Sequence, residues 1–370
     1  MATKKKSSHA LSASCLMGLA AWSSVVNADN TSVGLLNPSL TPQQQGWLIG
    51  GNYPVWDVTA NEAFITANTI GVTLPPNYPR VQLFYRPVPI LVEEGYSVDL
   101  WLKVNDAPMP HIAPEPPYVP VSSVAFYPST TTARLVHRGY PPQQAIYFDE
   151  DGIGWGDESD MFAMDTTDNF HHYRIEVAGN GDVQVLVDGE PALQRTGLKI
   201  YPRVAFGDIA DVEGMDSRYS ISSLTVTGEI TKFVPIDARP GYCPNPSIDG
   251  RISSLYYPIA IVATPDFDPR QIDPASIRIN GIAPDAWSIR DASRPYSPYM
   301  GKEFPEDCSP AGADGRKDLV VAYYQRRLAT ALGTEYAGPT LRLTGRLKPE
   351  FGGTAFAGED VVSVHSVQAP

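Results

Sequence analysis

The sequence predicts an all-β protein with the antiparallel sheets of a sandwich or jelly roll. Short segments in which apolar and polar residues alternate follow one another along the chain, and Pro, Gly, Asn and Asp separate them. An alternation of period two is typical of a strand with one buried face, and many such strands between turn signals are typical of sandwiches. Between residues 29 and 229, no segment of comparable length carries the apolar stripe of a helix.

The clearest strands lie in "NFHHYRIEVAGNGDVQVLVDGEPAL", residues 169–193. In its first half the apolar residues alternate with polar ones, namely Tyr173, Ile175 and Val177 with His172, Arg174 and Glu176. "AGNGD" then supplies residues that tolerate the positive φ of a tight reversal, and the alternation resumes from Val183 to Val187 before "DGEP" ends it. The segment therefore predicts a long β-hairpin whose polar side chains share one face.

The remaining elements of the first 230 residues follow the same pattern. The predicted strands are 80–90, 96–104, 121–128, 133–139, 145–151, 171–177, 182–188 and 219–228. Dense prolines make 107–121 a surface loop, because proline cannot donate to a central strand.

Residues 1–28 have the features of a secretory signal peptide. Lys4 to Lys6 precede an apolar run, and "VNA" ends at Ala28 with small side chains where a signal peptidase cuts. Removal of this leader and its three lysines takes the net charge from −13 to −16. Such an acidic surface repels the phosphates of nucleic acids and anionic lipids. No later stretch has the roughly 20 apolar residues of a membrane span, so we expect a soluble, exported protein.

A second unit is predicted to begin near residue 231. Prolines at 235, 240, 244 and 246 redirect the chain within Thr231–Pro246. We therefore expect domains at 29–230 and 231–370. The predicted elements of the second domain are a buried strand in 256–267, a turn leading into a strand in 273–281, strands in 317–324 and 339–347, a short helix in 324–333, and a last strand in 358–367.

Two cysteines remain once Cys15 leaves with the leader. An even pair in an oxidising compartment usually forms a disulfide, so Cys243 is expected to pair with Cys308. A metal site at the two thiols is disfavoured, since the further ligands that zinc needs are not nearby.

Two resemblances extend these predictions. "FHHYRIEVAGNGDVQVLVDGE" and "YPRVAFGDIADVEGMDSRYSISSLTVTG" resemble the penultimate hairpin and the closing strands of laminin-G-like, concanavalin A-type jelly-roll domains. "VPIDARPGYCPN", "YPIAIVATPDFDPRQIDPASIRINGIAP" and "DCSPAGADGRKDLVVAYY" resemble a β-sandwich module of secreted bacterial multidomain proteins. The first resemblance implies a fold that hosts lectins, glycoside hydrolases and polysaccharide lyases, and the second implies architecture and an exported compartment.

A ligand site is predicted on the polar face of the strands at 96–104 and 171–177. In "VDLWLKV", Val98, Leu100 and Leu102 share one side, which leaves Asp99, Trp101 and Lys103 on the other. A sugar ring stacks on an aromatic ring while charged groups bind its hydroxyls. With Trp101 on a concave face, the expected site residues are Asp99, Trp101, Lys103, Arg86, His172, Arg174 and Glu176. The alternative is that a loop covers Trp101 and the charges pair across strands.

Catalysis is the less favoured interpretation. The jelly-roll glycosidases carry Glu-x-Asp-x-(x)-Glu on one strand, and the sequence holds no such pattern. Glu93 and Glu94 are adjacent and so point to opposite faces. The nucleophile-elbow motif GxSxG is also absent. His171 and His172 face opposite ways on a strand and cannot chelate one metal together.

A calcium site is predicted in "EDCSPAGADGRKDL". Asp314-Gly315 followed by Asp318 has the spacing of extracellular calcium loops, and Asp307 could add a third oxygen. Ser309 and Ala311 stand where such loops place their leading aspartates, so an ordinary acidic turn is the alternative.

Together these features predict a secreted, non-catalytic carbohydrate-binding or adhesion protein of a bacterial surface or extracellular matrix. Its partner is then an extracellular glycan or surface protein. The alternatives are a glycan-degrading hydrolase or lyase and a structural, self-assembling surface component.

Overall fold

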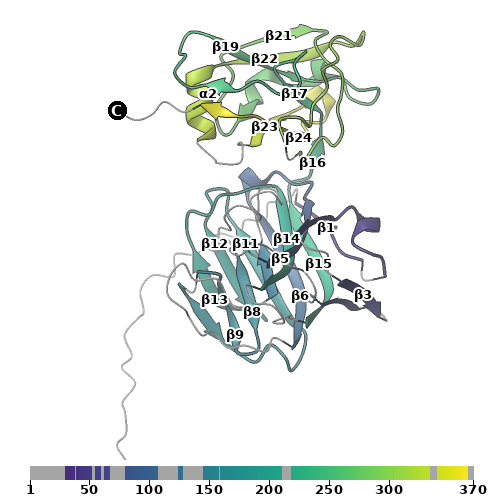
Figure 1. Cartoon of the computed structure of the whole chain (residues 1–370), viewed down its shortest axis with the longest axis vertical. Helices are drawn as coiled ribbons and strands as arrows, with labels where there is room; N and C mark the ends of the chain where they lie inside the picture. Colours follow the sequence, from purple (N-terminus) through teal and green to yellow (C-terminus); the bar gives the residue numbers. More distant parts are fainter. Residues whose placement is uncertain are drawn as a thin grey trace, which may run out of the picture.

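The computed structural model describes residues 30–37, 39–51, 55–59, 62–66, 80–106, 124–127, 145–157, 159–210, 218–302, 304–333 and 340–365. Within these ranges the protein is nearly all-β (Figure 1). The predicted all-β class, with an antiparallel sandwich followed by a smaller one, is confirmed. The predicted leader at 1–28, the loop at 107–121 and the strand at 133–139 lie outside the described residues. No helix in the described ranges is long and apolar enough to cross a membrane.

Two antiparallel sheets build the larger sandwich. The first has the order β13 (Glu190–Arg195), β12 (Val183–Val187), β11 (His171–Val177), β6 (Tyr96–Asp106), β15 (Arg218–Gly228), β4 (Glu62–Thr66) and β3 (Val55–Thr59), with β1 (Thr31–Gly34) also paired to β15. The second has the order β10 (Met161–Ala163), β9 (Gly152–Trp155), β8 (Ile146–Asp149), β7 (Val124–Tyr127), β14 (Arg203–Ala210), β5 (Arg80–Pro87) and β2 (Leu48–Gly51).

The apolar faces of these two sheets form one core. Val98 and Leu100 of β6 are fully buried in it, as are Phe148 of β8 and Tyr173 of β11. The rings of Phe148 and Tyr173 meet edge to face at 4.8 Å between centroids. Because side chains alternate along a strand, burial of this face turns Trp101 and its polar neighbours outward.

The smaller sandwich also consists of two main sheets. One has the order β16 (Thr231–Phe233), β24 (Ala355–Val361), β23 (Thr340–Arg346) and β20 (Arg278–Ile279), and the other β17 (Ile236–Ala238), β19 (Tyr256–Ile261), β22 (Asp318–Tyr324) and β21 (Ala286–Arg290). The short strands β18 (Ile248–Asp249) and β25 (Val364–His365) pair separately. The helix α2 (Gln325–Leu332) ends at Gly333, as predicted.

Single 3₁₀ turns connect several of these strands. They are η1 (Gln43–Gln45), η2 (Val92–Glu94), η4 (Pro269–Gln271), η5 (Pro274–Ser276) and η6 (Pro349–Phe351). The aspartates before η4 and η5 cap them, because Asp268 and Asp273 accept hydrogen bonds from backbone N–H groups two residues on. The predicted turn and strand at 273–281 correspond to η5 and β20.

Two predicted elements end differently in the structure. The hairpin was expected to end at "DGEP". In the structure a third strand, β13, begins there at Glu190, since Asp188 and Gly189 both take positive φ in a tight turn. The last strand was expected at 358–367. Instead β24 ends at Val361, and β25 pairs with β18 rather than with the sheet of β24.

The two sandwiches meet end to end, with β16 entering the smaller one (Figure 1). Within the described ranges, three ion pairs join them: Arg203 with Glu359, Arg342 with Glu93, and Arg346 with Glu229. The first of these pairs is fully buried. The junction is thus a packed, charged interface, and residues of both sandwiches line a cavity within it.

Candidate functional site

The clearest candidate site is the outer face of β6 and β11, which we call the Trp101 face. It holds Asp99, Trp101, Lys103, His172, Arg174 and Glu176. Strand pairing places Trp101 directly opposite His172 and Asp99 directly opposite Arg174. Side chains opposite each other on one sheet face are close enough to interact, so the register alone brings these groups together.

Trp101 is exposed on this face. The residue keeps 42% of its surface accessible, and His172 stacks on its ring at 5.0 Å between centroids and 18° between planes. Large aromatic rings on a sheet are normally buried. An accessible indole held in place by a neighbouring ring is a surface on which another flat, partly apolar group can stack.

A network of charged hydrogen bonds surrounds this ring. Asp99 accepts from Arg174 Nη1 at 3.0 Å and contacts His172 Nε2 at 2.9 Å. Arg174 Nε donates to Glu176 at 3.1 Å. Burial alone would lower the pKa of Arg174, but the two carboxylates raise it above its usual value. The charges therefore pair across strands, and they also hold carboxylate oxygens at fixed positions beside an exposed ring.

The two other predicted members of the site have different positions. Lys103 lies on the Trp101 face at its margin, where its ammonium donates to the carbonyl of Asp168 at 3.3 Å. Arg86 is not brought to this face. It belongs to β5 in the opposite sheet, and its guanidinium donates to the carbonyl of Leu35 at 2.8 Å. Which of two sheets a strand joins depends on distant pairing partners, which local alternation does not specify.

His171 has a structural role beside the site. Its Nδ1 contacts Asp188 at 2.7 Å and its Nε2 contacts Asp168 at 2.9 Å. Burial alone would lower the pKa of His171, but the two carboxylates raise it. The ring ties the start of β11 to the β12–β13 turn.

The sequence did not single out three polar neighbours of the Trp101 face. On β15, Ser223 lies opposite Trp101 and Thr225 opposite Asp99, while Gln184 of β12 lies opposite Glu176. The alternating hydroxyls in "SLTVTG" were a usable signal for β15. Its pairing with β6 could not be read from them, because a register shift lies between Ile221 and Ser223.

The predicted calcium ligands do not form a metal site. Asp318 is fully buried, and its carboxylate accepts from the backbone N–H groups of Ala263 at 2.9 Å, Ala292 at 2.8 Å and Ser293 at 3.0 Å. Asp314 pairs with Arg316 at 3.1 Å. No group of three or more His, Cys, Asp or Glu side chains in the described ranges is arranged to hold a metal ion. These residues therefore do not fit calcium, since their oxygens already have donors.

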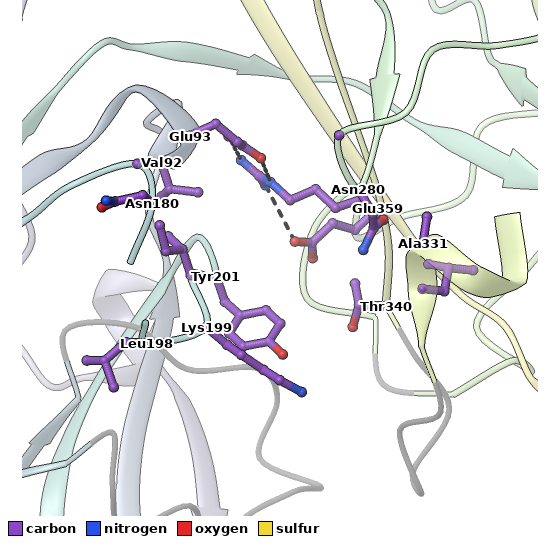
Figure 2. Close-up of a pocket in the computed structure, with 15 residues that line it drawn as sticks. Val92, Glu93, Asn180, Leu198, Lys199, Tyr201, Asn280, Ala331, Thr340 and Glu359 are labelled. Carbon is purple, nitrogen blue, oxygen red and sulfur yellow. Dashed lines mark hydrogen bonds and ion pairs between the residues drawn. The ribbon is translucent and has the colours of Figure 1, made fainter. Parts of the chain in front are cut away.

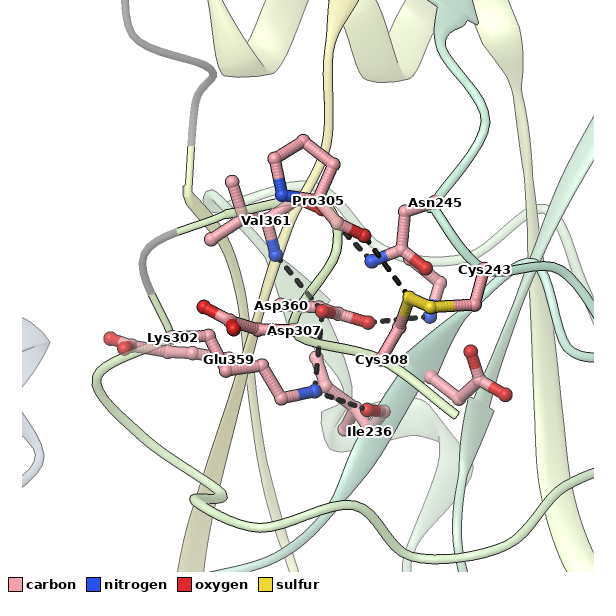
Figure 3. A network of polar contacts seen from close by, with 12 residues as sticks. Ile236, Cys243, Asn245, Lys302, Pro305, Asp307, Cys308, Glu359, Asp360 and Val361 are labelled. Carbon is pink, nitrogen blue, oxygen red and sulfur yellow. Dashed lines mark hydrogen bonds and ion pairs between the residues drawn. A yellow bond between two sulfur atoms is a disulfide. The ribbon is translucent and has the colours of Figure 1, made fainter. Parts of the chain in front are cut away.

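Asp307 accepts from the backbone N–H of Phe304 at 2.9 Å, close to the disulfide. Cys243 and Cys308 are joined, with 5.6 Å between their Cα atoms (Figure 3). Beside this bridge Lys302 is buried and contacts Asp360 and the carbonyl of Ile236, both at 3.2 Å. The two loops that carry the cysteines are thus joined by the disulfide, and a buried ion pair lies beside it.

Comparison with known proteins gives no family for the chain. No family model matches it, and no curated protein matches it. Solved structures similar to it are a sialidase, the potassium-bound carbohydrate recognition domain of Emp46p, and the carbohydrate esterase vb_24B_21 from the Shiga toxin-encoding bacteriophage phi24B.

The likeness to these structures is distant. Their sequence identities are 11%, 12% and 14%, and their TM-scores 0.35, 0.33 and 0.34. The matches cover 50%, 52% and 54% of this chain and 17%, 95% and 99% of those chains. The chain therefore spans about a sixth of the sialidase. At these values the likeness assigns neither a ligand nor an activity to this protein.

Proposed function

We propose that this protein is a secreted, non-catalytic carbohydrate-binding protein and that the Trp101 face binds the glycan. The observation that carries the proposal is an accessible tryptophan, stacked on His172 and bordered by an ordered network of charged groups.

The chemistry of the face suits a sugar. The indole offers a flat surface for pyranose C–H groups, and Asp99, Arg174 and Glu176 offer acceptors and donors for hydroxyls. Because Asp99 and Glu176 already accept from Arg174, the network is formed before a ligand arrives. Preformed polar groups reduce the ordering cost of binding.

Export is part of the same proposal. The leader-like residues 1–28, the net charge of −13 and the joined pair Cys243–Cys308 all suit an extracellular protein. The partner that we propose is an extracellular glycan. The proposal includes no calcium at this face, because the carboxylates of the face are paired with Arg174 and His172.

One observation favours a second candidate, an enzyme that cleaves glycans. His172 is partly exposed and its Nε2 contacts the Asp99 carboxylate at 2.9 Å, an arrangement that orients an imidazole for proton transfer. The same contacts also serve a purely structural network, so this candidate needs a measurement of turnover.

The test combines binding with turnover on one panel of polysaccharides. Calorimetry of the mature protein identifies ligands, and the same mixtures are assayed for new reducing ends and for unsaturated products. Binding without product supports the proposal. Product that grows with time and disappears in His172→Gln would establish the enzyme instead.

Trp101→Ala is the decisive variant for the site. It should abolish binding while leaving the free energy of unfolding within about 0.5 kcal/mol, since an exposed side chain adds little to the core. Trp287→Ala is the matched control, because Trp287 is 56% exposed on β21 of the smaller sandwich. Equal affinities in both variants would remove the Trp101 face from the binding site.

A further inference from the structure

A cavity of about 420 Å³ lies at the junction of the two sandwiches (Figure 2). The larger sandwich contributes Asn180, Lys199 and Tyr201 to its wall, and the smaller one contributes Thr340 and Arg342. This volume is in the range of small-molecule sites. Polar groups from six separate segments converge there, although no motif in the sequence marks the place.

Two buried charged groups in the cavity wall lack part of their hydrogen bonding. Arg342 keeps 8% of its surface accessible and Glu359 keeps 1%. Among the described residues, neither Arg342 Nη1 nor Glu359 Oε1 has a hydrogen-bond partner. The two atoms form an ion pair with each other at 3.6 Å. The other donors of Arg342 are used by Glu93, and Glu359 Oε2 accepts from Arg203 and from the backbone of Gly301.

Arg342 Nη1 thus needs a hydrogen-bond acceptor, and Glu359 Oε1 beside it needs a donor. A distance of 3.6 Å is too long for a hydrogen bond, yet one oxygen can reach both atoms. A hydroxyl group fits this need, because it accepts from the guanidinium and donates to the carboxylate. A carboxylate ligand fits less well, since it would place a second negative charge beside Glu359 and leave Oε1 without a donor.

The cavity also offers an aromatic surface. Figure 2 shows the ring of Tyr201 projecting into the space below the carboxylate of Glu359, with Thr340 across from it. Asn180 adds an amide on the side of the larger sandwich. A ring facing a set of hydroxyl-binding groups is suited to a small ligand with C–H groups on one face and hydroxyls at its edge.

We propose that this junction cavity binds a neutral, polyhydroxylated ligand the size of one sugar residue, with a hydroxyl bridging Arg342 and Glu359. The site is separate from the Trp101 face and does not depend on the function proposed for it. Since both sandwiches supply its walls, ligand binding should also hold them together.

The test uses the mature protein with Trp101→Ala, so that binding at the Trp101 face is silent. The probes are the methyl pyranosides of glucose, galactose and mannose, with glucuronate as the charged comparison, and binding is followed by saturation-transfer NMR and titration. At least one neutral glycoside should bind, and more tightly than glucuronate. Tyr201→Ala and Thr340→Val should each weaken it at least tenfold, whereas Tyr242→Ala, an exposed tyrosine elsewhere, should not.

Glu359→Gln should also weaken binding, but it perturbs the buried pair with Arg203, so Tyr201→Ala and Thr340→Val carry the conclusion. The inference is overturned if no neutral glycoside binds, which would mean that ordered water alone bridges the two side chains. Tighter binding of glucuronate, or affinities that neither cavity variant changes, would overturn it as well.

Discussion

Three aspartates of the smaller sandwich are buried, and each carboxylate is satisfied differently. Asp360 pairs with Lys302, and Asp318 accepts three backbone N–H groups. Asp237 accepts from the hydroxyl of Ser293, but its Oδ1 has no partner among the described residues. Burial, with the nearby charge of Asp360, raises the pKa of Asp237 to about 6. A carboxylate buried with so few donors favours its protonated form.

This pKa predicts a pH dependence that Asp237→Asn removes. The folded-state pKa lies above the unfolded value of 3.8, so between about pH 4 and 6 the folded state holds a proton that the unfolded state has lost. The stabilisation is therefore complete below pH 4 and is lost as the pH rises through 6. Between pH 7 and 4.5, wild type should gain about 2 kcal/mol relative to Asp237→Asn.

Urea denaturation of both proteins at several pH values measures this difference. A difference in the free energy of unfolding that is the same at every pH does not matter here. Only the part of the difference that changes with pH reports the titration of Asp237. If the free energies of unfolding of the two proteins change in parallel between pH 4.5 and 7, Asp237 does not titrate in this range.

Asp318 is predicted to be structural rather than a metal ligand. Asp318→Ala leaves three backbone N–H groups without their acceptor, and it should cost about 3 kcal/mol. Asp314→Ala should lower the free energy of unfolding by no more than about 1 kcal/mol, because the side chain of its partner Arg316 is about half exposed. Melting curves in millimolar calcium and in chelator should coincide for wild type. A calcium-dependent rise that both variants abolish would restore the metal site.

At the scale of elements, glycines position the β11–β12 turn against the rest of the protein. Gly181 takes a φ of +87°, which favours glycine. Gly179 is required for a different reason, since a Cβ there would lie 2.0 Å from the carbonyl oxygen of Glu93. The turn therefore packs closely on η2, and Asn180 between the two glycines reaches the junction cavity.

The disulfide is the main covalent constraint on the loops of the smaller sandwich. It closes a segment 65 residues in sequence separation. In the chain-entropy model, removing it with Cys243→Ser plus Cys308→Ser should lower the free energy of unfolding by about 4 kcal/mol. Guanidinium denaturation of the double variant and of reduced wild type should agree. If neither differs from the oxidised protein, the bridge does not constrain the unfolded chain.

At the scale of the whole molecule, ion pairs of two kinds connect the sandwiches. Arg203 and Glu359 are buried with 0% and 1% of their side chains accessible, whereas Arg346 and Glu229 are partly exposed. A buried pair that loses one partner leaves an uncompensated charge, but a partly exposed pair can be replaced by water. The coupling between the sandwiches should therefore depend mainly on Arg203 and Glu359.

Arg203→Met is predicted to lower the free energy of unfolding by about 3–5 kcal/mol. Arg346→Ala, the matched control at the same junction, should lower it by no more than about 1 kcal/mol. Calorimetric melting of both variants measures the contrast. Addition of Glu359→Gln to Arg203→Met should recover part of the loss, and equal effects of Arg203→Met and Arg346→Ala would contradict this view of the junction.

Much of the fold was predictable from local pattern. Alternation in 96–104 and 171–177 assigned the buried and outward faces correctly, because successive side chains of a strand must point to opposite sides. Turn residues predicted the β11–β12 reversal, and the cysteine count predicted the pair that is joined. The sequence also predicted part of the candidate site, because the outward-facing polar residues of β6 and β11 lie together on one sheet face.

What local pattern could not supply was the pairing of distant segments. Arg86 alternates correctly on its own strand, but β5 pairs with β14 in the other sheet. The spacing of Asp314 and Asp318 resembles a calcium loop, yet the carboxylate of Asp318 is taken by backbone groups from two other loops.

By itself the sequence determined the all-β class, the face on which each strand residue lies, and hence the outward position of Trp101. Only the tertiary structure decided which strands became neighbours, that Trp101 stacks on His172, and that Arg342 and Glu359 meet at a cavity between the sandwiches. The reason is physical: alternation is a property of a single strand's backbone, whereas register and junction contacts join segments up to 249 residues apart.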